Sequence, residues 1–82
     1  MRIRDRGDLR EPVLKAIRSH KGRASLRQVA KYIWENYRDE ITSSPQLVYT
    51  WQYDYRWVAM ELRKEGLLRP ADESPKGVWE LA

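Results

Sequence analysis

The apolar residues of this chain recur at helical spacing in three successive segments, and this pattern restricts its possible folds more than any other feature. The segments cover residues 9–20, 25–37 and 45–65. With 82 residues the chain has room for one small core, which four Trp and five Tyr side chains help to fill. The inward positions are Leu9, Val13, Ala16, Ile17 and His20 in the first segment, Leu26, Val29, Ala30, Ile33, Trp34 and Tyr37 in the second, and Val48, Trp51, Tyr55, Val58, Ala59 and Leu62 in the third.

Capping residues and helix breakers predict where the first two helices begin and end. Asp8 precedes the first helix as a cap, and Gly22 supplies its C-terminal stop. Residues 23–24 form a short extended link, after which Ser25 is a strong N-cap for the second helix. The polar residues 38–44 are typical of a turn, so we expect the second helix to end before them.

Two positions are open for the start of the third helix. Ser44-Pro45 combines a cap with a residue suited to the first helical position, which predicts a start at residue 45. The β-branched Val48 and Thr50 weaken the first turns, so a start near residue 50 is the alternative. In either case Gly66 predicts the end of the helix.

Two short apolar runs after the third helix predict a β-hairpin. Residues 67–69 and 77–81 favour strands, and the turn-rich residues 70–76 join them. Three helices followed by a two-stranded hairpin form the element order of a winged helix-turn-helix, an α+β fold. We expect this domain to span residues 8–82. Residues 1–7 have alternate arginines and no helical period, which predicts a flexible basic arm.

The charge of the chain is unevenly distributed. Residues 1–38 hold eleven basic and four acidic side chains, whereas residues 39–82 hold five basic and eight acidic ones. Eleven of the cations are Arg, whose planar guanidinium matches phosphate and the guanine edge. A polyanion is therefore the leading class of partner, and a basic half that merely keeps a small domain in solution is the alternative.

The last third of the chain carries a motif with a more specific resemblance. It consists of Trp57, Leu62, Gly66-Leu67-Leu68 and Gly77-Val78-Trp79. With these residues the chain resembles the N-terminal winged-helix domain of Mrr-type restriction endonucleases; before residue 56 only the order of helices is similar. The resemblance implies DNA binding on behalf of a restriction or nuclease system. Because these residues include no nuclease domain, we expect cleavage to reside in another chain or a longer parent protein.

Within a winged helix-turn-helix, the third helix is the element expected to enter the major groove of double-stranded DNA. Arg56 suits the O6 and N7 atoms of guanine, and Gln52 suits adenine. The alternative for each residue is a solvated helix surface. The expected reading face is Gln46, Tyr49, Gln52, Tyr53, Arg56 and Arg63, and the expected phosphate contacts are Arg23, Arg27, Lys31, Arg69 and Lys76. The arm residues Arg2, Arg4 and Arg6 are candidates for a minor groove, with a plain disordered tail as the alternative.

Trp57 and Met60 project on the side of the third helix opposite its inward stripe. We expect the hairpin wing to cover Trp57. The alternative is an exposed apolar patch that docks a partner chain, such as a nuclease domain or a second copy, in a protein-docking winged helix without direct DNA binding.

The sequence holds no catalytic constellation. There is no Cys, and the single histidine, His20, suits a core or helix-capping role. The acidic pairs at 39–40 and 72–73 lack further ligands and are more typical of solvated loops than of a metal site. We therefore predict a non-enzyme without cofactor or metal. No apolar run approaches the roughly 20 residues of a membrane span, so we expect a cytoplasmic protein with no membrane partner.

Overall fold

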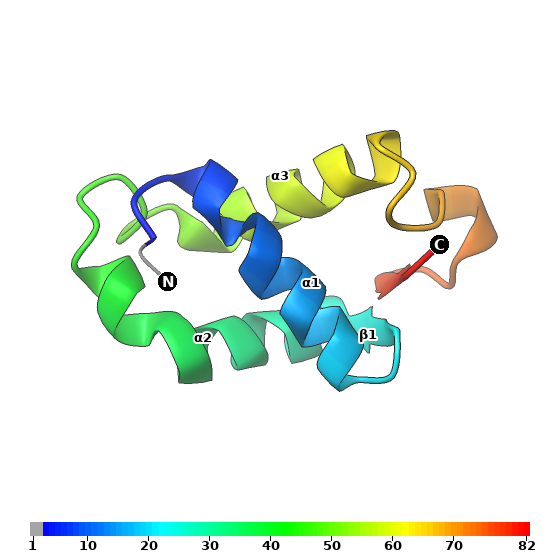
Figure 1. Cartoon of the computed structure of the whole chain (residues 1–82), viewed down its shortest axis with the longest axis horizontal. Coiled ribbons are helices and arrows are strands. Elements are labelled where there is room, and N and C mark those ends of the chain that lie inside the picture. Colours follow the sequence, from blue (N-terminus) through cyan, green and yellow to red (C-terminus); the bar gives the residue numbers. More distant parts are fainter. Residues whose placement is uncertain (1–2) are drawn as a thin grey trace.

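The computed structural model describes residues 3–82, and within them the chain forms three α-helices and a two-stranded antiparallel sheet (Figure 1). This arrangement is an α+β domain, as the sequence predicts. The elements are a 3₁₀-helix η1 (Arg6–Leu9), helix α1 (Arg10–Ser19), strand β1 (Arg23–Ser25), helix α2 (Leu26–Thr42), helix α3 (Trp51–Lys64), a 3₁₀-helix η2 (Ala71–Glu73) and strand β2 (Val78–Glu80).

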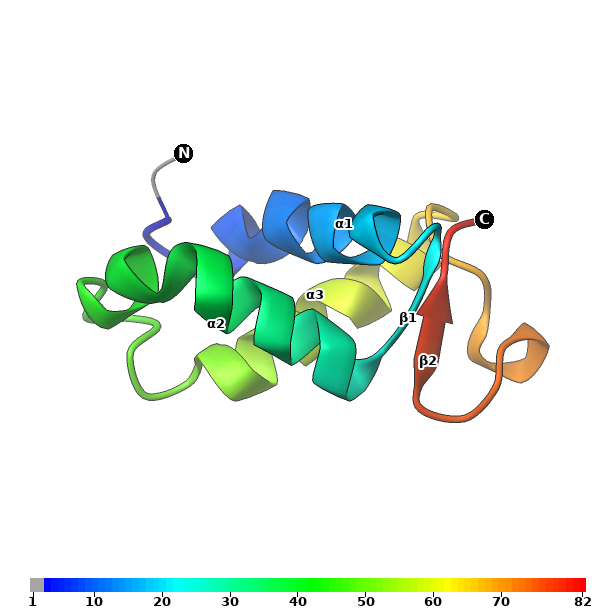
Figure 2. The same cartoon turned by 90° about the horizontal axis from the view of Figure 1, so that it is seen from below.

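The core lies where α1 packs against both α2 and α3 (Figures 1 and 2). The inward positions of the three helices are mostly buried, which confirms the three apolar stripes. The sheet closes one end of this core with Ala24 and Trp79, which are 1% and 6% exposed and face each other in register. Within residues 3–82, no helix is both long and apolar enough to cross a membrane.

The N-terminal segment differs from the flexible arm that the sequence predicts. Ile3 is 4% exposed and belongs to the core. Asp5 and Asp8 form a reciprocal capping box around η1, and α1 continues directly from it, so Asp8 does not cap α1 as expected. Because one buried isoleucine and two capping carboxylates lie among the arginines, residues 3–7 have enough local interactions to order them. Arg2 lies outside the described residues.

Helix α2 begins as predicted and ends later than predicted. The side chain of Ser25 accepts from the Gln28 amide in a capping box, which confirms the predicted cap. The helix then runs to Thr42, so the turn expected at 38–44 is wrong. Ile41 is fully buried and falls four residues after Tyr37, which extends the inward stripe by one turn; Tyr37 itself marks a kink, with a φ of −131°.

Helix α3 begins at Trp51, so the later of the two predicted starts is confirmed. Residues 45–50 form consecutive turns that bury Leu47 beneath them. The predicted stop is also confirmed. Gly66 has a φ of +82°, and the Leu67 amide bonds the Leu62 carbonyl at 3.0 Å, which closes the helix end.

The predicted hairpin is confirmed in part, and the sequence missed a further strand in the same sheet. Strand β2 pairs with β1, and residues 67–69 pair with its other edge through the antiparallel bridge between Leu68 and Leu81, flanked by bonds from the Arg69 amide to the Glu80 carbonyl and from the Ala82 amide to the Leu67 carbonyl. Pairing with β1 places Ala24 against Trp79 over the core, and the bridge residue Leu68 on the other edge is 1% exposed. Burial of apolar side chains therefore supports the pairing on both edges of the last strand.

Candidate nucleic-acid interface

The outward side of α3 and the turn before it present the expected reading residues to solvent. Tyr49 and Tyr53 are 89% and 72% exposed, and Gln52 and Arg56 are exposed as well. The guanidinium carbon of Arg56 lies 5.9 Å from the ring centre of Tyr55 on the same helix. These four residues remain available to a ligand, as does Gln46 in the turn.

One flank of α3, which we call the α3 flank, consists of Gln52, Arg56 and Arg63 at helical spacing. It faces the sheet, because Arg63 donates to the carbonyl oxygens of Arg69 and Val78, both at 3.1 Å. Arg63 is thus occupied by the chain's own backbone, whereas the sequence predicts a reading residue. Gln52 and Arg56 lie further along the same flank.

The carboxylates of α3 lie on its opposite flank, toward η1 and α1. Glu65, at the C-cap, receives two hydrogen bonds from Arg10 of α1, one of them at 2.6 Å. Glu61 precedes Glu65 by one turn and pairs with Lys64, and Asp54 receives a bond from Thr50. The three carboxylates therefore lie apart from Arg56 and Arg63, whereas Lys64 shares their side of the helix.

Helix α2 adds a row of exposed side chains that we call the α2 stripe: Arg27, Lys31, Trp34 and Arg38, spaced by four, three and four residues. Trp34 stacks on Trp51, with ring centres 5.5 Å apart and planes 11° apart. That stack joins α2 to the start of α3, and the two helices lie beside each other there (Figure 2). Three of its four residues are cations, and the exposed Glu35 lies at the margin of the α2 stripe, one turn after Lys31.

The cations near the sheet divide into two groups. Lys76 precedes Gly77, whose carbonyl accepts from the Leu26 amide at 3.0 Å, so Lys76 lies by the start of α2 near Arg27. Arg23 instead stands opposite Glu80 in the sheet register, and Arg69 bonds the Glu80 carbonyl through its amide. Arg23 and Arg69 are exposed, but both lie near Glu80, whose negative charge weakens their attraction for a phosphate.

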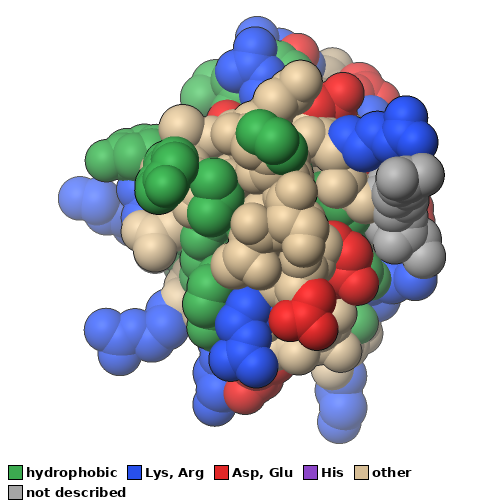
Figure 3. Space-filling model, turned by 90° about the vertical axis from the view of Figure 1, so that its left-hand side faces the viewer, with side chains coloured by type: hydrophobic (Ala, Val, Ile, Leu, Met, Phe, Trp, Pro, Cys, Tyr) green, Lys and Arg blue, Asp and Glu red, His purple; other side chains and the backbone are tan. Residues whose placement is uncertain are grey.

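Trp57 is covered by the N-terminal segment, so the expectation that the wing covers it is wrong. The guanidinium carbon of Arg6 lies 4.0 Å from the Trp57 ring centre, in cation–π contact. Trp57 remains 37% exposed and Met60 54% exposed. Figure 3 looks onto the end of the molecule formed by the turn at 43–50, where hydrophobic side chains gather along one edge and Lys and Arg project around it.

Sequence reasoning missed Trp34 and Arg38 as surface residues. The helical period places Trp34 in the inward stripe, and the polar composition of residues 38–44 places Arg38 in a turn. Their spacing from Arg27 and Lys31 is the signal that could have identified the α2 stripe.

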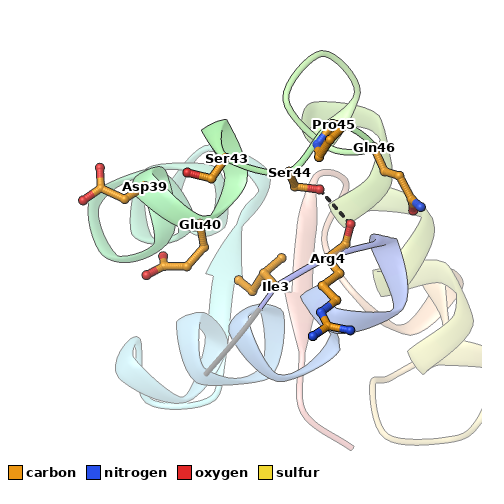
Figure 4. A pocket seen from close by; sticks show the side chains of 8 residues that line it. All are labelled: Ile3, Arg4, Asp39, Glu40, Ser43, Ser44, Pro45 and Gln46. Carbon is orange, nitrogen blue, oxygen red and sulfur yellow. Dashed lines mark hydrogen bonds between the residues drawn. The ribbon is translucent and has the colours of Figure 1, made fainter.

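His20 lies at the end of α1, and the acidic pair at 39–40 lies in the last turn of α2 rather than in the expected loop. His20 caps the end of α1 through a contact of 2.9 Å between its Nδ1 and the Ala16 carbonyl, which confirms the capping role. Within residues 3–82, no three His, Asp or Glu side chains lie close enough to hold a metal. A hollow at the end of α2 is lined by Asp39, Glu40 and the N-terminal segment, which the Ser44 hydroxyl holds by donating to the Arg4 carbonyl at 2.7 Å (Figure 4).

Comparison with protein-family models, with curated proteins and with solved structures gave no match for this chain.

Proposed function

We propose that this chain is a double-stranded DNA-binding module with a winged helix-turn-helix layout. The observation that carries the proposal is the surface formed by the α2 stripe and the α3 flank. The stack of Trp34 on Trp51 joins the two helices there, both helices expose cationic or amide side chains, and the carboxylates of α3 lie on its other side. A surface that is basic and rich in hydrogen-bond donors complements the phosphate backbone and base edges of DNA.

Individual roles follow from the side chains and their exposure. Arg56 and Gln52 suit bidentate bonds to guanine and adenine in the major groove. Tyr49 and Tyr53 provide hydroxyl groups for phosphate and ring edges for thymine methyl groups. Arg27, Lys31, Arg38 and Lys76 neutralise phosphates, which supplies affinity without sequence preference. Within this proposal the segment after α3 acts as the wing, and the module serves a restriction or nuclease-associated system or a small regulator.

Binding to a labelled duplex, measured by fluorescence anisotropy over a range of salt concentrations, tests the proposal. The logarithm of the binding constant should fall linearly with the logarithm of salt concentration, by about 0.9 for each phosphate neutralised. Lys31→Ala should reduce that slope by about one unit. Lys15→Ala removes an equal charge from an exposed position on α1 and is the matched control. Undetectable binding to duplex DNA at low salt would refute the proposal.

A protein-docking function is the second candidate, supported by the row of Tyr53, Trp57 and Met60 on α3. These side chains are 72%, 37% and 54% exposed and lie at helical spacing. In this case the partner is a nuclease domain or a second copy. Met60→Ser should then weaken binding to that partner, and neither the wild-type chain nor the variant should show salt-dependent binding to duplex DNA.

A further inference from the structure

Trp34 is a large aromatic residue that lies among cations on the surface of α2. It is 38% exposed, whereas Val29 and Ile33 on the same helix are fully buried. Lys31 and Arg38 lie one helical turn before and after it. A flat apolar ring between two cations is complementary to a ligand that carries both a flat apolar surface and negative charge.

The Trp34 ring is held in place before any ligand arrives. It stacks on Trp51, which is 9% exposed, and the row continues inward from Trp51 to Tyr55 and from Tyr55 to Trp79, with ring centres 5.8 and 5.9 Å apart. A ring fixed by such contacts loses little conformational entropy when a second ring stacks on it.

Trp34 also differs from Trp57, which is exposed to a similar extent. The guanidinium of Arg6 contacts the Trp57 ring, at 4.0 Å from its centre. The guanidinium of Arg38 lies 5.9 Å from the centre of Trp34, a greater distance. A cation therefore lies near the Trp34 ring without the close contact that Arg6 makes with Trp57.

We propose that Trp34 stacks on an unpaired nucleotide base of DNA, while Lys31 and Arg38 neutralise the adjacent phosphates. Aromatic rings within a basic surface bind single-stranded nucleic acid, because every base has a π-face. The inference rests on the proposed duplex binding and extends it. Trp34 contacts Trp51, the neighbour of Gln52, so one DNA molecule can contact both sites. The preferred ligand is then a duplex with a single-stranded extension.

The test uses three DNAs that share one duplex: a blunt form, a form with a short single-stranded extension, and a form whose extension has the same phosphates but abasic sugars. The wild-type chain should bind the base-bearing extension at least about fivefold more tightly than the abasic one, the lower limit for stacking on one base. Trp34→Leu should bind the base-bearing and the abasic extension equally. Trp34→Phe, which retains an aromatic face, should keep most of the preference.

The outcomes separate the two proposals. Equal wild-type affinity for base-bearing and abasic extensions overturns stacking by Trp34 and leaves duplex binding intact. A preference for the base-bearing extension without blunt-duplex binding supports Trp34 and contradicts the duplex proposal. Failure to bind any of the three DNAs overturns both. Because the abasic comparison uses the wild-type chain, equal affinities overturn stacking by Trp34 even where a Trp34 variant does not fold.

Discussion

The side chain of Arg63, near the end of α3, donates a hydrogen bond of 3.1 Å to the backbone carbonyl of Val78 and thereby connects α3 to strand β2. A second bond from the same guanidinium reaches the Arg69 carbonyl. One charged side chain thus satisfies backbone acceptors from both segments that follow α3. The position of these segments relative to the α3 flank depends in part on Arg63.

Arg63→Met should lower the free energy of unfolding by about 1.5–3 kcal/mol, because it removes charged hydrogen bonds and keeps the apolar stem. Arg56→Met is the matched control on the same flank and should change the free energy by less than about 0.5 kcal/mol, since Arg56 is exposed. Urea denaturation followed by circular dichroism measures both values. Equal free energies of unfolding for the two variants would mean that the hydrogen bonds of Arg63 do not stabilise the fold and that Arg63 behaves as an exposed cation.

Arg56 and Arg27 should respond differently when DNA sequence is varied. Arg56→Ala should cost about 1–3 kcal/mol of binding free energy on a preferred duplex and little on others, because a base contact is lost. Arg27→Ala should weaken all duplexes alike and reduce the salt slope by about one unit. Anisotropy titrations with two duplexes of equal length distinguish them. A uniform loss for Arg56→Ala would assign Arg56 to phosphate contacts.

The helices could be predicted from the sequence because each has an apolar stripe with a clear cap or stop. Ser25 followed by Gln28, and Gly66 after the last inward residue, mark their ends through local hydrogen bonding and backbone conformation. Strand β1 could not be predicted in the same way. Its three residues are too short for an alternating pattern, and only contact with Trp79, far away in sequence, makes Ala24 part of a sheet.

The candidate site was predictable on α3 and only partly on α2. A helical wheel identifies Gln52 and Arg56 as outward residues without any tertiary information. The same wheel places Trp34 at the margin of the inward stripe, where sequence alone favours burial for so apolar a side chain. Its exposure follows from stacking against Trp51, which is a tertiary contact.

Ile3→Ala tests whether the N-terminal segment is part of the core. Because Ile3 is 4% exposed, the variant should lose about 2 kcal/mol of stability, at the low end for a buried isoleucine since the site lies near a chain end. Arg4→Ala is the control, since the Arg4 side chain is exposed and its backbone carbonyl, which binds Ser44, is retained. Thermal unfolding measures the difference. An unchanged melting temperature for Ile3→Ala would indicate that residues 3–7 behave as the flexible arm.

The pair of Arg10 and Glu65 should make stability depend on pH in the acidic range. The hydrogen bond from Arg10 is the main cause that lowers the pKa of Glu65 below its ordinary value of 4.5, and the charge of Arg10 adds to it. A carboxyl group whose pKa is lower in the folded chain stabilises the fold above its unfolded pKa, and that contribution disappears as the pH falls through the folded value.

The stability difference between wild type and Glu65→Gln should therefore be present at neutral pH and vanish below the folded pKa. It should be small and decrease with added salt, because both side chains are nearly half exposed. Urea unfolding of the two chains at a series of pH values measures it, and Arg10→Met should abolish the pH dependence of the difference. A difference that stays constant across that range would mean that the bond does not favour the charged carboxylate.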